Sequence, residues 1–238
     1  MDQLPPALPH GPLDEVFPGV FFVTGMMKTR LMDADWQFGR NMTVVRDGNA
    51  LTLINSVRLD DAGLARLDAL GRVTNVVKIG SWHGRDDAFY KARYNATFWA
   101  LPGMTHERGL LTDKELNPDG DMPFAGCAVF EFRTTKLPEC ILRIDRAGGI
   151  LIACDSLQNW LAPDEFFSDQ SRETMTQMGF FQHANLGPVW MRVSEPKAED
   201  FVRLRGLSFK HALCGHGAPL RDNAKEAYVA RFQRIFGV

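Results

Sequence analysis

The chain lacks the features that would tie it to a membrane or to nucleic acid. No apolar run approaches the ~20 residues that span a bilayer, and the first residues contain neither a basic region nor an apolar segment. The 27 Lys and Arg residues are fewer than the 29 Asp and Glu residues and are scattered along the chain, whereas phosphate-backbone binding needs clustered positive charge. We therefore expect a cytoplasmic protein that acts on a small molecule; its oligomeric state stays open.

The chain also lacks the short motifs of several common enzyme classes. It contains no G-x-S-x-G elbow, no G-x-x-x-x-G-K-[ST] loop and no G-x-G-x-x-G fingerprint. Cysteine is scarce and forms no C-x-x-C pair, which predicts reduced core thiols at Cys127, Cys140, Cys154 and Cys214. A Cys/His mechanism is disfavoured because a thiol in a buried strand is usually inert.

What is present is the composition of an ordinary globular protein. Hydrophobic residues make up 45% of the 238 positions, and 17 Phe with 5 Trp indicate a well-filled aromatic core. Five prolines in the first 18 residues predict an extended arm over residues 1–19, with His10 exposed to solvent. A single domain is expected over residues 20–238, with regular structure from Val20.

Alternation and turn signals predict two groups of strands with helices between and after them. The first group is expected over residues 20–23, 42–45, 50–54, 73–79 and 97–100, and the second over residues 128–132, 140–144 and 150–154. Helices are expected from Asp60 or Asp61 to Gly71, over residues 86–94, and over residues 224–236 with Asp222 or Asn223 as the cap.

Residues 102–123 show no period and predict a long surface loop, on which His106 would be a spare ligand or a substrate contact. Three other polar residues each follow an apolar run. His83 comes after a run ending at Ile79, Asp155 directly follows residues 149–154, and His216 follows residues 211–214. Buried strands in layered α/β folds bring side chains together just beyond their carboxyl ends, so the pattern predicts a site.

Strand groups separated by helices, with His, Asp and His at strand ends in that order, resemble the layout of the metallo-β-lactamase fold. The resemblance implies an α/β fold, a four-layer αββα sandwich in which two mixed β-sheets are flanked by helices. In that superfamily one strand ends in an H-x-H-x-D-H motif, a later strand ends in Asp, and the last strand ends in His. The corresponding places here are residues 81–88 (SWHGRDDA), Asp155 and the Gly215-His216-Gly217 segment.

The motif is degenerate in this chain. With His83 at the first His position, Arg85, Asp87 and Ala88 stand at the second His, the Asp and the third His. With His83 at the second His position, Ser81, Arg85 and Asp86 fill the remaining positions. The family usually has a further His ahead of the strand that ends in Asp, and Glu139 either substitutes for it or is a plain surface carboxylate.

Imidazoles together with carboxylates suit Zn²⁺, Fe²⁺ or Mn²⁺. The resemblance implies that His83, Asp87, Asp155 and His216 hold one such metal, with Asp87 either a ligand or the catalytic base. These residues are too few for the two-metal site of better equipped members of the family.

Two functions therefore stay open. The first is a metallo-hydrolase whose metal-activated hydroxide attacks an ester, amide, thioester or phosphoester bond. The second is a degenerate, metal-free member of the fold that acts as a binding or structural protein. Arg85 favours the second because a guanidinium among the ligands would repel a dication, and it could pair with Asp155 or Asp86 instead.

Each candidate also has a purely structural interpretation. His83 would be a turn histidine bonded to backbone, Asp86 or Asp87 would be a helix N-cap, and Asp155 would form an Asx-turn. His216 is the strongest functional candidate, because glycine on both sides lets the backbone approach a ligand closely.

Overall fold

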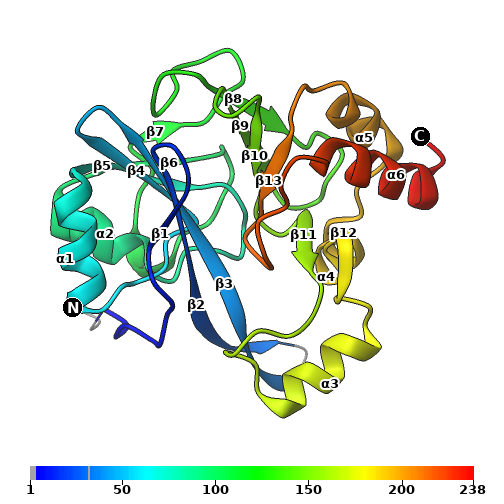
Figure 1. The fold of residues 1–238 in the computed structure, drawn as a ribbon, viewed down its shortest axis with the longest axis horizontal. Helices are drawn as coiled ribbons and strands as arrows, with labels where there is room; N and C mark the ends of the chain where they lie inside the picture. Colours follow the sequence, from blue (N-terminus) through cyan, green and yellow to red (C-terminus); the bar gives the residue numbers. More distant parts are fainter. Residues whose placement is uncertain (1–3, 32) are drawn as a thin grey trace.

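The computed structural model describes residues 4–31 and 33–238, and its strands form two large sheets and one small one (Figure 1). The seven-stranded sheet contains, in spatial order, β1 (Asp14–Phe17), β2 (Val20–Leu31), β3 (Ala34–Asp47), β4 (Ala50–Ile54), β5 (Arg72–Lys78), β6 (Thr97–Ala100) and β7 (Lys114–Glu115). The four-stranded sheet has the order β13 (His211–Leu213), β10 (Ile150–Ile152), β9 (Cys140–Ile144) and β8 (Cys127–Glu131). A separate antiparallel pair consists of β11 (Leu157–Trp160) and β12 (Gln182–Leu186).

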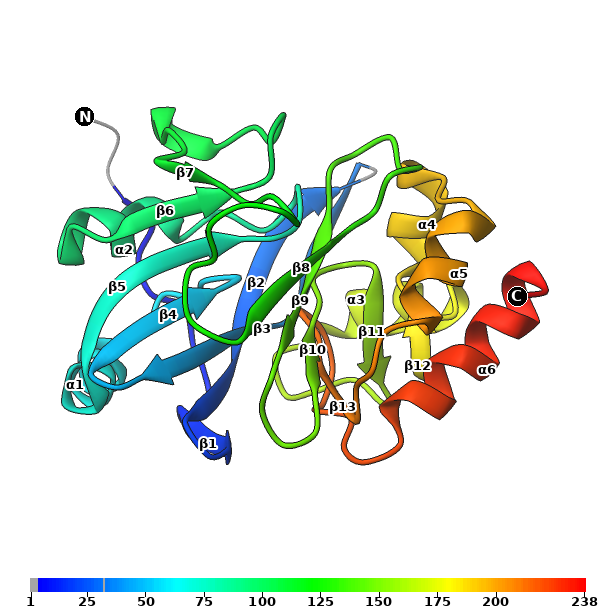
Figure 2. The same cartoon turned by 90° about the horizontal axis from the view of Figure 1, so that it is seen from above.

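Helices cover the outer faces of both large sheets (Figure 2). The first sheet is covered by α1 (Asp61–Leu70) and α2 (Asp87–Tyr94), and the second by α4 (Pro188–Ser194), α5 (Ala198–Arg205) and α6 (Ala224–Phe236). A further helix, α3 (Asp169–Gln177), contacts β3. Both large sheets contain parallel and antiparallel pairs, so the expected αββα sandwich of two mixed sheets is confirmed.

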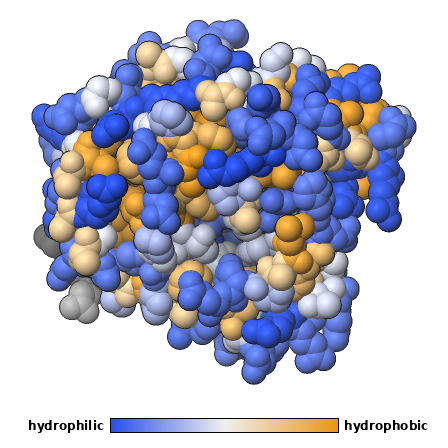
Figure 3. All heavy atoms as spheres, in the orientation of Figure 1, coloured by the Kyte–Doolittle hydropathy of each residue, from blue (hydrophilic) through white to orange (hydrophobic). Residues whose placement is uncertain are grey.

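The second sheet is buried on both faces, as a middle layer of a sandwich must be. Along β9 and β10 the side chains alternate, because neighbouring residues of a strand point to opposite faces. Ile150 and Ile152 belong to the core shared with the first sheet, whereas Leu151 belongs to the core under α4, α5 and α6. On the face seen in Figure 3, hydrophilic residues cover most of the surface and apolar atoms show between them in smaller groups.

The first sheet begins earlier and extends further than predicted. Strand β1 lies inside the Pro-rich arm and pairs with β2, so regular structure starts at Asp14 rather than Val20. The reason is that no proline lies between Pro12 and Pro18, which leaves the backbone donors of that stretch available. Strands β2 and β3 pair over 12 residues each and form a long hairpin beyond the predicted residues.

The predicted helices are present and their N-cap residues are among those expected, but only one of the three makes a side-chain capping bond. Asp60 caps α1 and accepts a hydrogen bond from Gly63 N at 2.8 Å, as expected. Asp86 and Asn223 stand at the N-cap positions of α2 and α6 without a side-chain capping bond. In the case of Asp86 the carboxylate is engaged by arginines instead.

Several elements fall where no regular structure was predicted. The expected loop over residues 102–123 contains a short 3-10 turn (Glu107–Gly109) and β7, which adds a parallel edge to the first sheet. Residues 157–205 contain α3, α4, α5 and the β11–β12 pair. His10, predicted to be exposed, has a side chain that is 9% exposed, and its Nε2 accepts a hydrogen bond from Asp60 N.

The two large sheets meet at the edge that carries the predicted site residues. Cys140 N donates to Ile79 O at 2.9 Å, and Asn55 Nδ2 donates to Ala153 O at 3.2 Å. These bonds join the carboxyl ends of β4 and β5 to the start of β9 and to the chain just beyond β10. Among the described residues no helix is long and apolar enough to cross a membrane, and all four cysteines are free.

Candidate active site

Three of the four predicted ligands come together at this edge. His83 lies in the loop between β5 and α2, Asp155 follows β10, and His216 follows β13. Strands β10 and β13 are parallel neighbours, so Asp155 and His216 leave the second sheet at the same end. All three side chains are buried, with residue exposures of 5 to 7%.

The ligand atoms of the three residues converge on one point. His216 Nε2 lies 3.1 Å from Asp155 Oδ1 and 3.1 Å from His83 Nε2. His83 Nε2 lies 3.7 Å from the same carboxylate oxygen. Cys154 Sγ is also near, within 4.8 Å of ligand atoms of His83 and Asp155.

The orientation of His216 is set from several sides. Its Nδ1 lies 3.1 Å from Gly39 O, so the tautomer that donates to this carbonyl leaves Nε2 with a free lone pair. The ring packs between Trp160 and Phe38, at centroid distances of 4.9 and 5.6 Å. Gly217 is required here because its φ is +86° and a Cβ would lie 2.2 Å from the backbone of Asn159.

A buried asparagine fastens the loop of His216 to the first sheet. Asn41 N donates to Gly215 O at 2.8 Å. Its side-chain Nδ2 donates to Cys214 O at 2.9 Å and to Gly217 O at 2.7 Å. Three hydrogen bonds from one residue of β3 therefore hold the segment on both sides of His216 in place.

The protonation states of the group suit a ligand set. Burial lowers the pKa of His83, and the charge of Asp155 offsets this only in part, so the imidazole is neutral at pH 7. Burial acts to raise the pKa of Asp155, but the neighbouring His83 and His216 prevail and lower it, so this residue is a carboxylate. Burial and the charge of Asp155 raise the pKa of Cys154, which stays a thiol.

A cavity of about 230 Å³ opens onto this group. Its wall is largely aromatic and includes four of the five tryptophans of the chain, together with Met27, Phe38, Met175 and Phe180. The tryptophans are Trp36, Trp82, Trp160 and Trp190. The long β2–β3 hairpin and the segment around α3 supply most of this wall, which explains why these otherwise unpredicted elements matter for the site.

Several solved structures share this architecture. The fold matches FIM-1 from Pseudomonas aeruginosa in its mono-zinc form, with a TM-score of 0.60, 13% identity and 98% of each chain covered. It also matches a metallo-β-lactamase from Hirschia baltica (TM-score 0.58, 14% identity, 93% of this chain and 98% of that one). A third match is a metallo-β-lactamase from Erythrobacter litoralis with β-mercaptoethanol in its active site (TM-score 0.61, 14% identity, 94% and 96% covered). Neither a protein-family model nor a curated protein matches the sequence.

The chain has the metallo-β-lactamase fold. Within this metallo-β-lactamase-fold protein, the expected order of His, Asp and His at strand ends corresponds to three side chains that meet in space.

Asp87, the fourth predicted ligand and the predicted base, is not brought to this group. It stands at the first position of α2, where it accepts a hydrogen bond from Ser56 Oγ at 2.5 Å. Burial raises its pKa to about 6, although the Ser56 bond and the charge of Lys78 act in the opposite direction. Lys78 is itself buried, and its Nζ donates to Thr105 O at 2.8 Å.

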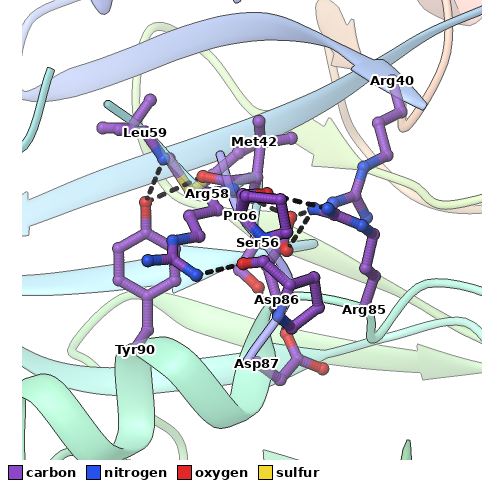
Figure 4. Close-up of polar contacts among 12 residues, drawn as sticks. Pro6, Arg40, Met42, Ser56, Arg58, Leu59, Arg85, Asp86, Asp87 and Tyr90 are labelled. Carbon is purple, nitrogen blue, oxygen red and sulfur yellow. Dashed lines mark hydrogen bonds and ion pairs between the residues drawn. The ribbon is translucent and has the colours of Figure 1, made fainter. Parts of the chain in front are cut away.

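The arginine predicted to oppose a metal is paired with Asp86 (Figure 4). Arg85 Nη1 donates to Asp86 Oδ1 at 2.6 Å, while Arg40 forms a buried ion pair with Oδ2 of the same carboxylate. Arg58 N also donates to Oδ2, at 2.9 Å. Of the two pairings expected for Arg85, with Asp155 or with Asp86, the structure shows the second.

Two basic residues of this region were missed. Arg40 comes from β3 and lines the cavity, and Lys78 ends β5. A lone lysine within the apolar run of residues 76–79 is a signal that could have found Lys78. Arg40 interrupts the alternating apolar series Trp36, Phe38, Met42 and Val44 of β3, and a charged residue in such a series is also a signal that could have found it.

Glu139 is not a surface carboxylate, because it is only 2% exposed. It accepts a hydrogen bond from Ser156 N at 2.6 Å. Burial, together with the charge of nearby Asp155, raises the pKa of Glu139 well above its usual range. In this protonation state it supports the backbone after Asp155 rather than adding a second negative charge.

Proposed function

We propose that this protein is a metal-dependent hydrolase that holds one divalent cation between His83, Asp155 and His216. The observation that carries the proposal is the convergence of their three ligand atoms at distances of 3.1, 3.1 and 3.7 Å. Zn²⁺, Fe²⁺ and Mn²⁺ are the candidates that the donor set favours.

These distances fit a metal. Zinc lies about 2.0 to 2.2 Å from imidazole nitrogen and carboxylate oxygen, so ligand atoms around a tetrahedral zinc lie roughly 3.3 Å apart. The three observed separations lie on either side of that value. Three protein ligands with one open position are also the usual number in catalytic zinc sites.

The placement of the ring nitrogens supports the same conclusion. His216 Nε2 lies 3.1 Å from the carboxylate of Asp155 and 3.1 Å from the ring nitrogen of His83, an arrangement that a shared cation would stabilise. We leave Asp87 outside the ligand set, since its carboxylate is bonded to Ser56. The metal-binding sites of this fold with more histidines hold two ions, whereas the residues here provide for one.

A divalent metal supplies Lewis acidity and lowers the pKa of a water that it binds, so that a nucleophile is available near neutral pH. The chain itself supplies the rest. His83, Asp155 and His216 hold their positions through buried contacts, and the aromatic wall excludes water and receives the apolar part of a substrate. The scissile bond would be an ester, amide, thioester or phosphoester.

The competing proposal is a metal-free binding protein, and the Arg85–Asp86 pair in the motif region favours it. Metal analysis of protein purified without chelator separates the two. We expect about one metal per chain, or stoichiometric uptake of added Zn²⁺ by isothermal titration calorimetry, with binding lost in His216→Ala. His183→Ala, which changes an exposed histidine of β12, is the matched control.

Substitution with Co²⁺ adds a spectroscopic readout. Ligation by His83, Asp155 and His216 predicts visible d–d bands without a sulfur-to-cobalt charge-transfer band, because Cys154, although nearby, is outside the proposed ligand set. No uptake of Zn²⁺ or Mn²⁺ at micromolar concentration, or equal uptake by His216→Ala, would contradict the proposal and support the metal-free alternative.

A further inference from the structure

A buried guanidinium faces the cavity beside the three proposed ligands. Arg40 is part of the cavity wall together with His83, Asp155 and His216, and its side chain is 3% exposed. Among the described residues that line the cavity, it is the only lysine or arginine. The acidic residues of the wall are Asp155, which belongs to the proposed ligand set, and Glu107, which is exposed.

The ion pair of Arg40 with Asp86 does not neutralise all of the positive charge there, and it leaves one N–H donor of Arg40 without an acceptor among the described residues. Asp86 accepts from Arg40, from Arg85 and from Arg58 N, so one carboxylate neutralises two guanidinium groups (Figure 4). Arg40 Nε is buried and has no hydrogen-bond partner among the described residues. A buried donor without an acceptor is rare in folded proteins and calls for an explanation.

The rest of the cavity is apolar and aromatic. Trp36 and Phe180 belong to a cluster of buried side chains that also includes Trp160, and Trp82 lies at 40% exposure. Such a wall binds flat apolar groups, while a single charged residue fixes their orientation. The ligand that matches both features carries an apolar group at one end and a negative charge at the other.

We infer that the cavity binds amphipathic carboxylates, with an aromatic or aliphatic group against the tryptophans and the carboxylate accepting from Arg40. The inference rests on the proposed function in one respect: it assigns the bound carboxylate to the substrate hydrolysed at the same site. Arg40 is then a specificity-determining residue, and uncharged analogues of the substrate bind weakly.

The test uses tryptophan fluorescence, excited at 295 nm, because four of the five tryptophans line the cavity. The probes are 4-phenylbutyrate and 4-phenylbutanamide, which differ in charge and little in shape. Each is titrated into chelator-treated protein and into protein loaded with Zn²⁺. The variants are Arg40→Gln and Arg40→Lys, and Arg46→Gln on the same strand is the matched control outside the cavity.

In metal-free wild-type protein the carboxylate should bind about tenfold more tightly than the amide, the size expected for one charged hydrogen bond. Arg40→Gln should remove this preference while leaving amide binding unchanged, which also shows that the cavity is intact. Arg46→Gln should keep it. If Arg40→Gln does not fold, the inference is still tested by the affinities of the wild-type protein for the two probes and by Arg40→Lys. The lysine keeps the charge and should keep part of the preference for the carboxylate.

Equal affinities for the two probes in metal-free protein would overturn the inference, as would a preference that survives in Arg40→Gln. A preference that appears only with Zn²⁺ would also overturn it, because the metal would then hold the carboxylate, and the proposed function would stand. The protein could also prefer the carboxylate probe over the amide and yet take up no Zn²⁺. This result would support carboxylate binding by Arg40 and contradict the proposed function.

Discussion

Replacing Asp87 by asparagine should change how the stability of the protein depends on pH. Asp87 is buried and faces Ser56, Lys78, Arg40 and Asp86. Burial raises its pKa from the usual 3.8 to about 6 against the effect of the Ser56 bond and of Lys78. At 1.36 kcal/mol for each pH unit, this difference corresponds to about 3 kcal/mol.

The sign follows from which state binds the proton. Below about pH 3 Asp87 is protonated in both the folded and the unfolded chain, and the full benefit of keeping it neutral in the core is present. As the pH rises through 6, the folded state has to ionise this buried group, and that benefit is lost. Asp87→Asn cannot ionise, so its stability relative to wild type should rise by about 2 kcal/mol between pH 4 and pH 7.5.

The measurement is urea unfolding followed by circular dichroism at several pH values, with the m-value checked at each. Asp61→Asn, at an exposed position in the first turn of α1, controls for the amide substitution itself. A difference between wild type and Asp87→Asn that stays constant over this pH range would refute the reasoning. It would mean that Lys78 outweighs burial and keeps Asp87 ionised.

Three further predictions concern the metal, the loop of His216 and the core. Free Zn²⁺ at 100 times its Kd should stabilise the protein by about 2.7 kcal/mol, measured as a rise in Tm that is absent in His216→Ala. Asn41→Ala removes two hydrogen bonds to the His216 loop and should weaken Zn²⁺ binding about tenfold in competition with a chelator; unchanged affinity would refute this role. Leu151→Ala should cost about 2 to 5 kcal/mol in urea unfolding, because this side chain is fully buried under the helices of the second sheet; a loss below about 1 kcal/mol would contradict that packing.

The strand ends of the site were predictable because their signal is local. Each of His83, Asp155 and His216 comes after an apolar run, and such runs predict buried strands whatever the rest of the chain does. That these ends meet follows from the topology, in which β10 and β13 are parallel neighbours. The three side chains lie together at the distances given above, and their role as metal ligands stays a prediction.

The surroundings of the site depend on contacts between distant segments. Arg40 and Asp86 are 46 residues apart, and Asn41 reaches a loop more than 170 residues further along the chain. No local pattern reports such pairings. Asp86 illustrates the limit, because an acidic residue before a helix predicts a cap, whereas its carboxylate pairs with the neighbouring Arg85 and with Arg40 from the distant strand β3.

The positive charges of the motif region also bear on the number of metals. Arg85 stands at a motif position, Arg40 shares the carboxylate of Asp86 with it, and Lys78 lies close to Asp87, so Asp86 and Asp87 supply two carboxylates for these three cations. A second dication there would face uncompensated repulsion in a buried site, where charges interact strongly. In the arrangement proposed above, a single metal would act on the reacting bond and Arg40 would bind the charge of the substrate.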